Sequence, residues 1–220
     1  METYNIIRNL SMYSVFIPLL FFVRALCNKL QPASVKLLGS LLVISALSDF
    51  ISLISYQYFK INPNPIILVY AVAQFILLSL VYRSVYTNTI LQKITIAGIV
   101  LFVAFAFVNF FFVQGIVRLN SNAFTASSAL LLVYSVLYFH QLLHDLPDPF
   151  IERIFMFWAS AAVFIYFGTN LFLFATVDRV IDKNDNQFLL SWALHNGSNA
   201  FKNIVFAIAM FVASIKRFAK

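Results

Sequence analysis

FLLSWALHNGSNAFKNIVFAIAMFVA, residues 188–213, and LLGSLLVISALSDFISLISYQYF, residues 37–59, are the two stretches that decide the fold. Each exceeds the roughly 20 apolar residues that cross a bilayer, yet each carries a charge near its middle, Lys202 and Asp49 respectively. A charge at the bilayer centre costs about 2.5 to 3.5 kcal/mol on insertion scales, so such residues usually face a bundle interior, pair, or mark a path for ions or ligands. Asp49 and Lys202 therefore indicate a polar interior in a membrane protein.

The overall composition agrees with this interpretation. Of the 220 residues, 62% are hydrophobic and 10% are charged, and the mean hydropathy is +0.88. In soluble domains about a quarter of all residues are charged. The chain is therefore expected to be an integral, multi-pass protein of a plasma membrane or bacterial inner membrane. At about 20 residues per crossing plus short loops, this length accommodates about seven helices and leaves no room for a soluble domain.

Apolar runs separated by polar, Pro-containing or Asn-rich breaks predict an all-α, seven-transmembrane-helix bundle formed by residues 1–220 as a single transmembrane domain. The predicted spans are residues 6–26, 37–59, 65–86, 94–113, 124–143, 150–175 and 188–214. Every connection is short, so no loop can build a globular ectodomain. Recognition is therefore expected inside the bundle or at its rims.

The distribution of basic residues predicts the orientation, because lysine and arginine concentrate in cytoplasmic loops. An N-terminus outside and a C-terminus inside places more basic residues on the inner side, namely Arg24, Lys29, Lys36, Arg83, Lys93, Arg153, Lys216, Arg217 and Lys220. The outer side then receives Arg8, Lys60, Arg118, Arg179 and Lys183. The net charge of +7 is explained by this bias, and nucleic acid is not expected as a partner.

Polar residues on the last span form one stripe. Ser191, His195, Ser198 and Lys202 follow one another at spacings of four, three and four, which places them on one face of a helix, and Asn196, Asn199 and Asn203 border or widen it. A helix surrounded by lipid would not tolerate such an arc. The seventh span is therefore expected to line the interior.

The second span carries a matching stripe at the same spacings, formed by Ser45, Asp49, Ser52 and Tyr56. Counted from the inner ends of their spans, Asp49 and Lys202 fall at nearly equal depth, so an ion pair between them is expected to be geometrically reasonable. Gln74, Asn109, Tyr166 and Asn170 on other spans could complete a polar cluster. The predicted ligand-binding residues are Asp49, Lys202, His195, Asn199, Gln74, Tyr166 and Asn170. The alternative interpretation is that these side chains only hold helices together.

A lysine near the middle of the seventh helix resembles the microbial rhodopsins, in which retinal is held at that place as a Schiff base. The resemblance implies retinal on Lys202, with Trp158 and Tyr166 in the wall of its pocket. The chain departs from that family in two ways: the third span offers Gln74 and no aspartate as a counter-ion, and the residue four before the lysine is Ser198. The resemblance covers one lysine and the architecture, and no residue role is carried over.

Two histidines give a partial metal-site pattern. His140 and His144 are four residues apart on the fifth span, a spacing at which two imidazoles can bind one zinc ion. A site would need a further ligand, which Asp148 or Glu152 could supply. The other interpretation is a solvated histidine pair at the membrane interface.

No nucleophile-elbow, zincin, P-loop or dinucleotide motif occurs, so the sequence gives no positive indication of catalysis. We expect a receptor-like or sensory membrane module that binds a small ligand, lipid or ion in a polar cavity and acts through an intracellular signalling partner. The alternative is a small secondary or proton-coupled transporter. A retinal-binding protein and a membrane-embedded lipid hydrolase are the third options.

Overall fold

The computed structural model describes residues 2–27, 31–115, 119–145, 149–181 and 185–215, and these residues are almost entirely helical. The helices are α1 (Glu2–Ser14), α2 (Phe16–Leu26), α3 (Ala33–Gln57), α4 (Asn64–Val85), α5 (Thr89–Val108), α6 (Ser121–Asp145), α7 (Phe155–Ile181) and α8 (Asp185–Ile215). A π-helical turn, η1 (Asn109–Val113), extends α5, and a 3-10 turn, η2 (Ile151–Arg153), precedes α7. With α1 and α2 forming one crossing, seven helical segments of the described chain are long and apolar enough to span a membrane. The predicted all-helical fold and the count of seven are confirmed.

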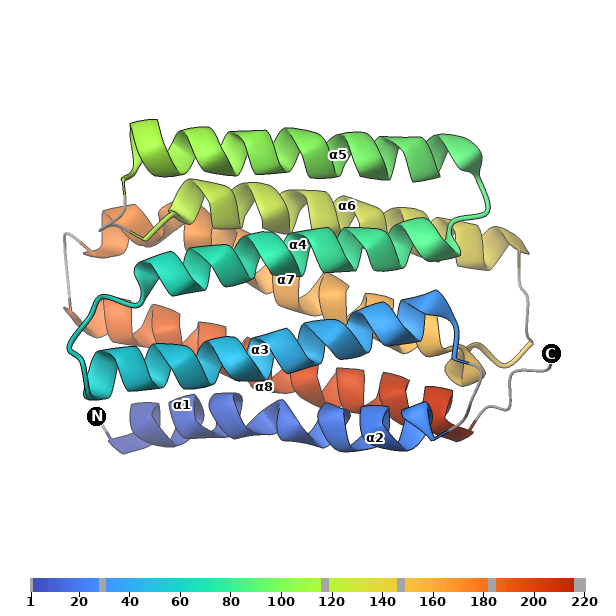
Figure 1. The fold of residues 1–220 in the computed structure, drawn as a ribbon, viewed down its shortest axis with the longest axis horizontal. Helices are drawn as coiled ribbons and strands as arrows, with labels where there is room; N and C mark the ends of the chain where they lie inside the picture. The colour runs from blue at the N-terminus through green and yellow to red at the C-terminus, as the bar shows by residue number, and fades with distance from the viewer. Residues whose placement is uncertain (1, 28–30, 116–118, 146–148, 182–184, 216–220) are drawn as a thin grey trace.

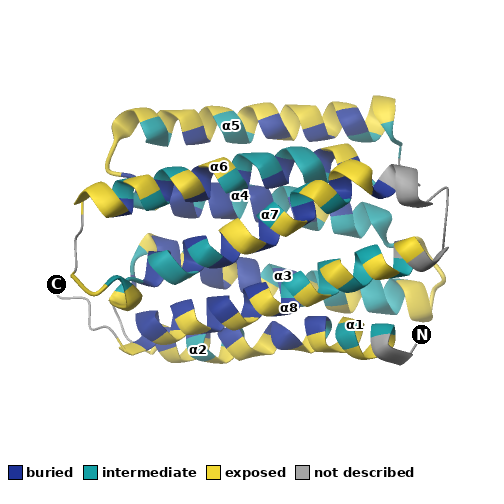
Figure 2. Ribbon diagram, turned by 180° about the vertical axis from the view of Figure 1, so that it is seen from behind, coloured by how far each residue is buried: buried dark blue, intermediate teal, exposed yellow. Residues whose placement is uncertain are grey.

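The helices run side by side along the long axis of the molecule (Figure 1). Their contacts arrange the first crossing, α3, α4, α6, α7 and α8 in a ring: α8 packs on α7 and on α1 and α2, α7 packs on α6, α6 packs on α4, and α4 packs on α3. The ring closes where α2 meets α3, while α5 lies outside it against α4 and α6. In Figure 2 the buried residues face the inside of the ring, and α5 is largely exposed. Helix α1 begins and α8 ends at opposite ends of the bundle (Figure 1).

Local chemistry moves three helix starts away from the predicted ones. Helix α3 begins directly after Pro32, an extended residue, and its first turn includes the exposed Lys36 that hydropathy alone had excluded. Helix α5 begins at Thr89 rather than 94 because the Asn88 side chain accepts a hydrogen bond from the backbone N–H of Ile90 at 2.8 Å, an N-cap. Helix α7 begins at Phe155 rather than 150 because η2 and an extended Ile154 come before it.

Pro18 divides the first crossing into two helices. A proline has no N–H with which to bond the carbonyl four residues earlier, so Ser14 loses its helical partner at the point where α1 ends. Helix α2 starts one residue after Val15 and holds Pro18 in its first turn. Because α2 packs on both α3 and α8 while α1 packs mainly on α8, this break allows the two halves of the crossing to contact different neighbours.

The half of the bundle that contains the end of α8 is closed by apolar side chains. Leu42, Leu78, Val163, Phe206 and Met210 come from four helices of the ring, and each is at least 98% buried. Side chains packed at this density leave few voids wider than a water molecule. We refer to these five residues as the apolar seal.

Gly39 permits the close contact between α2 and α3. A methyl group added at Gly39 would overlap the buried ring of Phe22. Gly39→Ala is therefore expected to lower the free energy of unfolding by about 1 to 3 kcal/mol, the usual cost of overpacking. An SDS unfolding titration of the purified protein measures this change, with Gly197→Ala as the matched control, because nothing lies within 4 Å of a methyl group there. Equal stability of the two variants would contradict this view of the α2–α3 contact.

Candidate functional site

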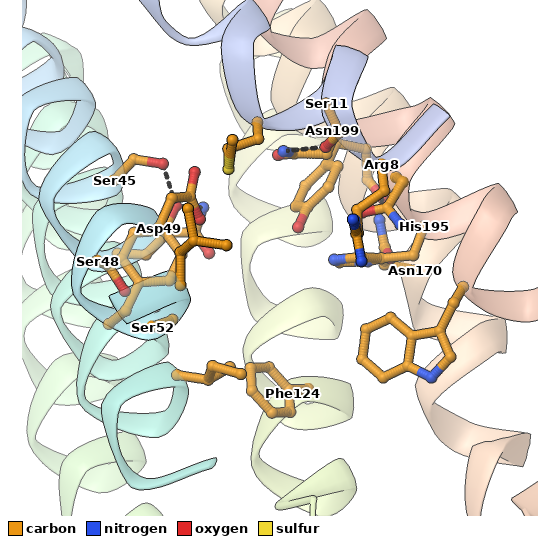
Figure 3. Close-up of a pocket in the computed structure, with 18 of the residues that line it drawn as sticks. Arg8, Ser11, Ser45, Ser48, Asp49, Ser52, Phe124, Asn170, His195 and Asn199 are labelled. Atoms are coloured by element: carbon orange, nitrogen blue, oxygen red, sulfur yellow. Dashed lines mark hydrogen bonds between the residues drawn. The ribbon is translucent and has the colours of Figure 1, made fainter. Parts of the chain in front are cut away.

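A cavity of about 670 Å³ lies inside the ring, in the half of the bundle that contains the start of α1 and the end of α3. Side chains from α1, α3, α4, α6, α7 and α8 line it. Figure 3 shows the α3 side chains on one wall and side chains of α1, α7 and α8 on the other, with Phe124 of α6 below them. This volume lies within the range of about 300 to 1,000 Å³ that is typical of small-molecule sites.

The α3 wall carries the predicted polar stripe. Ser45, Asp49, Ser52 and Tyr56 all line the cavity, and Ser48 joins them, because residues three and four apart share a helix face. Among the described residues, no side chain or backbone group makes a hydrogen bond or a close ion pair with the Asp49 carboxylate. A carboxylate at this depth without a protein partner is costly, so it is a natural contact point for a ligand.

A chain of hydrogen bonds supports the same wall from α4. The amide Nε2 of Gln74 donates to the Tyr70 hydroxyl at 3.0 Å, and this hydroxyl donates to Ser45 Oγ at 3.1 Å. Both Gln74 and Tyr70 line the cavity. Since Ser45 lies one turn from Asp49, these two hydrogen bonds fix the helix face that presents the Asp49 carboxylate.

The opposite wall is organised by Asn170, which is fully buried. Its amide Nδ2 donates to the backbone carbonyl of Tyr166 at 2.7 Å and to Ser198 Oγ at 3.1 Å, so its Oδ1 is the atom that faces His195 Nδ1 at 2.6 Å. Because an amide oxygen can only accept, Nδ1 of His195 carries the proton in the neutral ring. The Nε2 atom of His195 is then an unprotonated acceptor in a residue that lines the cavity.

Two asparagines of α8 hold α1 against the ring. Asn199 donates to Ser11 Oγ at 2.9 Å, and Asn203 donates to Ser14 Oγ at 2.8 Å. The Ser14 hydroxyl in turn donates to the carbonyl of Ser11 at 2.6 Å. Asn199 lines the cavity, so the contact that positions α1 also shapes the site.

Lys202 lies next to the cavity but not in its lining. Its side chain is buried, and Nζ lies 4.3 Å from the centroid of the Tyr166 ring, a cation–π contact. The expected direct ion pair with Asp49 is not formed: the one ion pair within 4.0 Å among the described residues joins His144 and Asp145. The charges of Asp49 and Lys202 nevertheless interact electrostatically across the intervening space.

The rim of the cavity is aromatic and contains one cation. Arg8 of α1 is exposed and, with Asp49, provides the only charged side chains among the described residues of the lining. Figure 3 places Arg8 on the wall opposite Asp49, near His195 and Asn170. Tyr13 and Tyr56 line the cavity and are also 59% and 64% exposed, so they form its outer edge.

Two polar residues lie elsewhere than expected. Asn109 is buried at the end of α5 and bonds to Gln114, Asn120 and Asn122, a separate polar cluster that ties α5 to the start of α6. The Ser191 hydroxyl donates to the backbone carbonyl of Gln187 and does not line the cavity. Both positions follow from ordinary helix chemistry, in which short polar side chains satisfy nearby backbone or helix-end groups.

The tryptophan expected in the wall of a retinal pocket also lies outside the cavity lining. Trp158 lies at the start of α7, where its Nε1 donates to the carbonyl of Glu152 at 2.8 Å. The tryptophan that lines the cavity is Trp192. Its ring centroid lies 5.4 Å from that of His195, at almost a right angle.

The histidine pair has no metal-site geometry. His140 and His144 are exposed, and His144 Nδ1 lies 3.3 Å from the carboxylate of Asp145. Within the described residues no three His, Cys, Asp or Glu side chains converge as metal ligands. Asp148, one of the two suggested additional ligands, lies outside the described residues.

The structure thus brings six of the seven predicted ligand-binding residues into one lining, namely Asp49, His195, Asn199, Gln74, Tyr166 and Asn170, and places Lys202 behind Tyr166. Sequence reasoning missed the contributions of α1 and α6, which are Arg8, Asn9, Ser11, Ser127 and Ser128. The serines on the first span were a usable signal, because Ser11 and Ser14 are three apart and Asn199 and Asn203 are four apart, so each pair lies on one helix face.

Comparison with protein-family models, with curated proteins and with solved structures gave no match.

Proposed function

We propose that this protein is a receptor-like membrane module that binds a small ligand in the cavity and acts through a separate partner protein. The observation that carries the proposal is the asymmetry of the interior. One half of the ring holds a polar cavity with an unpaired carboxylate, and the other half holds the apolar seal of Leu42, Leu78, Val163, Phe206 and Met210. A site that is closed toward one end of the bundle suits detection of a ligand better than passage of a solute.

Ligand binding can reach the rest of the molecule through α1 and α8. Asn199 is at once a lining residue and the donor that holds Ser11. A ligand that displaces Asn199 would release one of the two side-chain bonds between these helices, and the break at Pro18 allows α1 to move without α2. Such a shift changes the surface available to a partner, which is the output that the receptor proposal requires.

Labelling of single cysteines tests the proposal. The chain has one cysteine, so Cys27→Ser gives a cysteine-free background. In this background Ser48→Cys, in the cavity wall, is expected to react with a membrane-impermeant maleimide from one side of the membrane only. Ser79→Cys, fully buried in the half that contains the seal, is the matched control and is expected to stay unreactive from both sides.

The same experiment separates a receptor from a carrier. A transporter must expose its site to the opposite side during its cycle, so Ser79→Cys would then react from that side and solute flux into liposomes would be measurable. Either result would remove the receptor proposal. Reaction of Ser48→Cys from the outer side also tests the expected orientation, with the N-terminus outside.

A further inference from the structure

We propose that the cavity binds a molecule that carries both a primary ammonium group and an acidic group, with the ammonium at Asp49 and the acid at Arg8. This inference rests on the proposed function and names the class of its ligand. It follows from the atoms that remain available in the lining, from the charge balance and from the shape of the opening.

The available atoms deep in the cavity accept hydrogen bonds. Among the described residues, the Asp49 carboxylate and the Asn199 Oδ1 atom have no hydrogen-bond donor, and His195 presents an unprotonated Nε2. An ammonium group has three N–H donors, so it can bind the Asp49 carboxylate, and Asn199 and His195 offer further acceptors on the opposite wall (Figure 3). The aromatic ring of Trp192 in the same lining also favours a cation.

The charge balance excludes a simple cation or anion. Lys202 is buried beside the site, and its charge already offsets that of Asp49 without touching it. A cation at Asp49 would leave Arg8 without a partner in the ligand, and an anion at Arg8 would leave Asp49 without one. A ligand with one charge of each sign leaves the balance unchanged. Its acid finds a partner in Arg8, which lies on the opposite wall (Figure 3).

The relative depth of the two charged residues fits one small molecule. At 1.5 Å per residue, Asp49 lies about 12 Å from the end of α3 at Gln57, and Arg8 lies about 6 Å from the start of the first span at Tyr4. The ligand would therefore enter with its ammonium group first. Arginine recognises a carboxylate or a phosphate with paired N–H donors, so either acid satisfies the site.

Because the cavity also opens to the side, a ligand of this class can come from water or from the lipid bilayer. Among the described residues α2 packs on α3, but α1 makes no comparable contact with α3. Tyr13 of α1, about 14 Å from Tyr4 and hence near the depth of Asp49, lines the cavity and is mainly exposed. The ligand can thus be a water-soluble zwitterion that enters from the end, or the headgroup of an aminophospholipid that enters between α1 and α3.

Protection of a cavity cysteine from a neutral maleimide provides the test. In the full chain with Cys27→Ser and Ser48→Cys, glycerophosphoethanolamine, a phosphodiester with one charge of each sign, is expected to slow labelling. Ethanolamine and glycerophosphocholine are not expected to slow it, because they lack the acid and the N–H donors respectively. Arg8→Gln is expected to raise the half-protecting concentration about 10- to 100-fold, the loss of one charge-assisted contact. Arg8 is exposed, so this variant should fold. Arg24→Gln, also exposed but at the other end of the bundle, is expected to change nothing.

Lipid bilayers distinguish the two sources. In nanodiscs, phosphatidylethanolamine is expected to protect Ser48→Cys more than phosphatidylcholine if the ligand is a lipid headgroup, and equally if the ligand is a free zwitterion. Three results would overturn the inference: equal protection by glycerophosphocholine and glycerophosphoethanolamine, protection that survives Arg8→Gln, or no protection by either glycerophosphoethanolamine or phosphatidylethanolamine. One-sided labelling without such protection would leave the receptor proposal standing. Labelling of Ser79→Cys from the opposite side would instead remove the receptor proposal itself.

Discussion

Asn170→Leu is expected to lower the free energy of unfolding by about 2 to 5 kcal/mol, because leucine has a similar volume but leaves His195 Nδ1 and Ser198 Oγ without their buried partner. Asn170 is fully buried and joins α7 to α8 through both residues. The loss of the partner of His195 Nδ1 costs about 1 to 3 kcal/mol, and Ser198 Oγ loses the bond from Asn170 while it keeps its bond to the His195 carbonyl, at a further cost of about 1 kcal/mol. The two helices that lose these bonds form one wall of the cavity. An SDS unfolding titration in detergent micelles measures the change.

Asn199→Leu is the matched control, since the same replacement on the same wall removes the single side-chain bond to Ser11 at a partly exposed position. Its expected cost is about 1 kcal/mol. If Asn170→Leu were no more destabilising than Asn199→Leu, Asn170 would not organise this wall. The tautomer assigned to His195, and with it the acceptor in the cavity, would then lose its basis.

The helices and the site were not equally predictable from the sequence. Hydropathy and length located all seven crossings, because lipid demands an apolar run for every backbone segment that spans it. The starts of α5 and α7 depend on single residues, the N-cap Asn88 and the extended Ile154. A hydropathy average over many residues does not detect such positions. Helix periodicity alone predicted the α3 wall, because residues at spacings of four, three and four lie on one face of a helix whatever their neighbours are.

The partners of each polar residue were less predictable, because they depend on which helices are adjacent in the ring. Asn109 and Asn170 are both asparagines within apolar spans, yet only Asn170 belongs to the cavity, since α5 lies outside the ring. Asp49 and Lys202 form no direct ion pair, because α3 and α8 are separated by the first crossing and by the cavity. The sequence gives the position of each residue along its helix but not the lateral distance between two helices.

That separation alters the expected energetics of Asp49 and Lys202. Two unit charges 4 Å apart interact by about 4 kcal/mol at an effective dielectric constant near 20, and these two are farther apart than that contact distance. A double-mutant cycle with Asp49→Asn and Lys202→Met is therefore expected to give a coupling energy of about 1 to 4 kcal/mol. The coupling should persist in moderate salt, because screening is weak for buried charges.

The single variants are expected to differ. Asp49→Asn leaves the ammonium of Lys202, which is only 3% exposed, without its counter-charge, whereas Lys202→Met leaves a carboxylate that faces the cavity. The loss of free energy of unfolding should therefore be larger for Asp49→Asn, and the double variant should recover part of it. Asp49→Asn combined with Arg83→Gln, an exposed residue at the far end of α4, is the control pair and should be additive. Additivity for Asp49 and Lys202 as well would mean that the two charges do not sense each other, and the charge balance that favours a zwitterionic ligand would no longer hold.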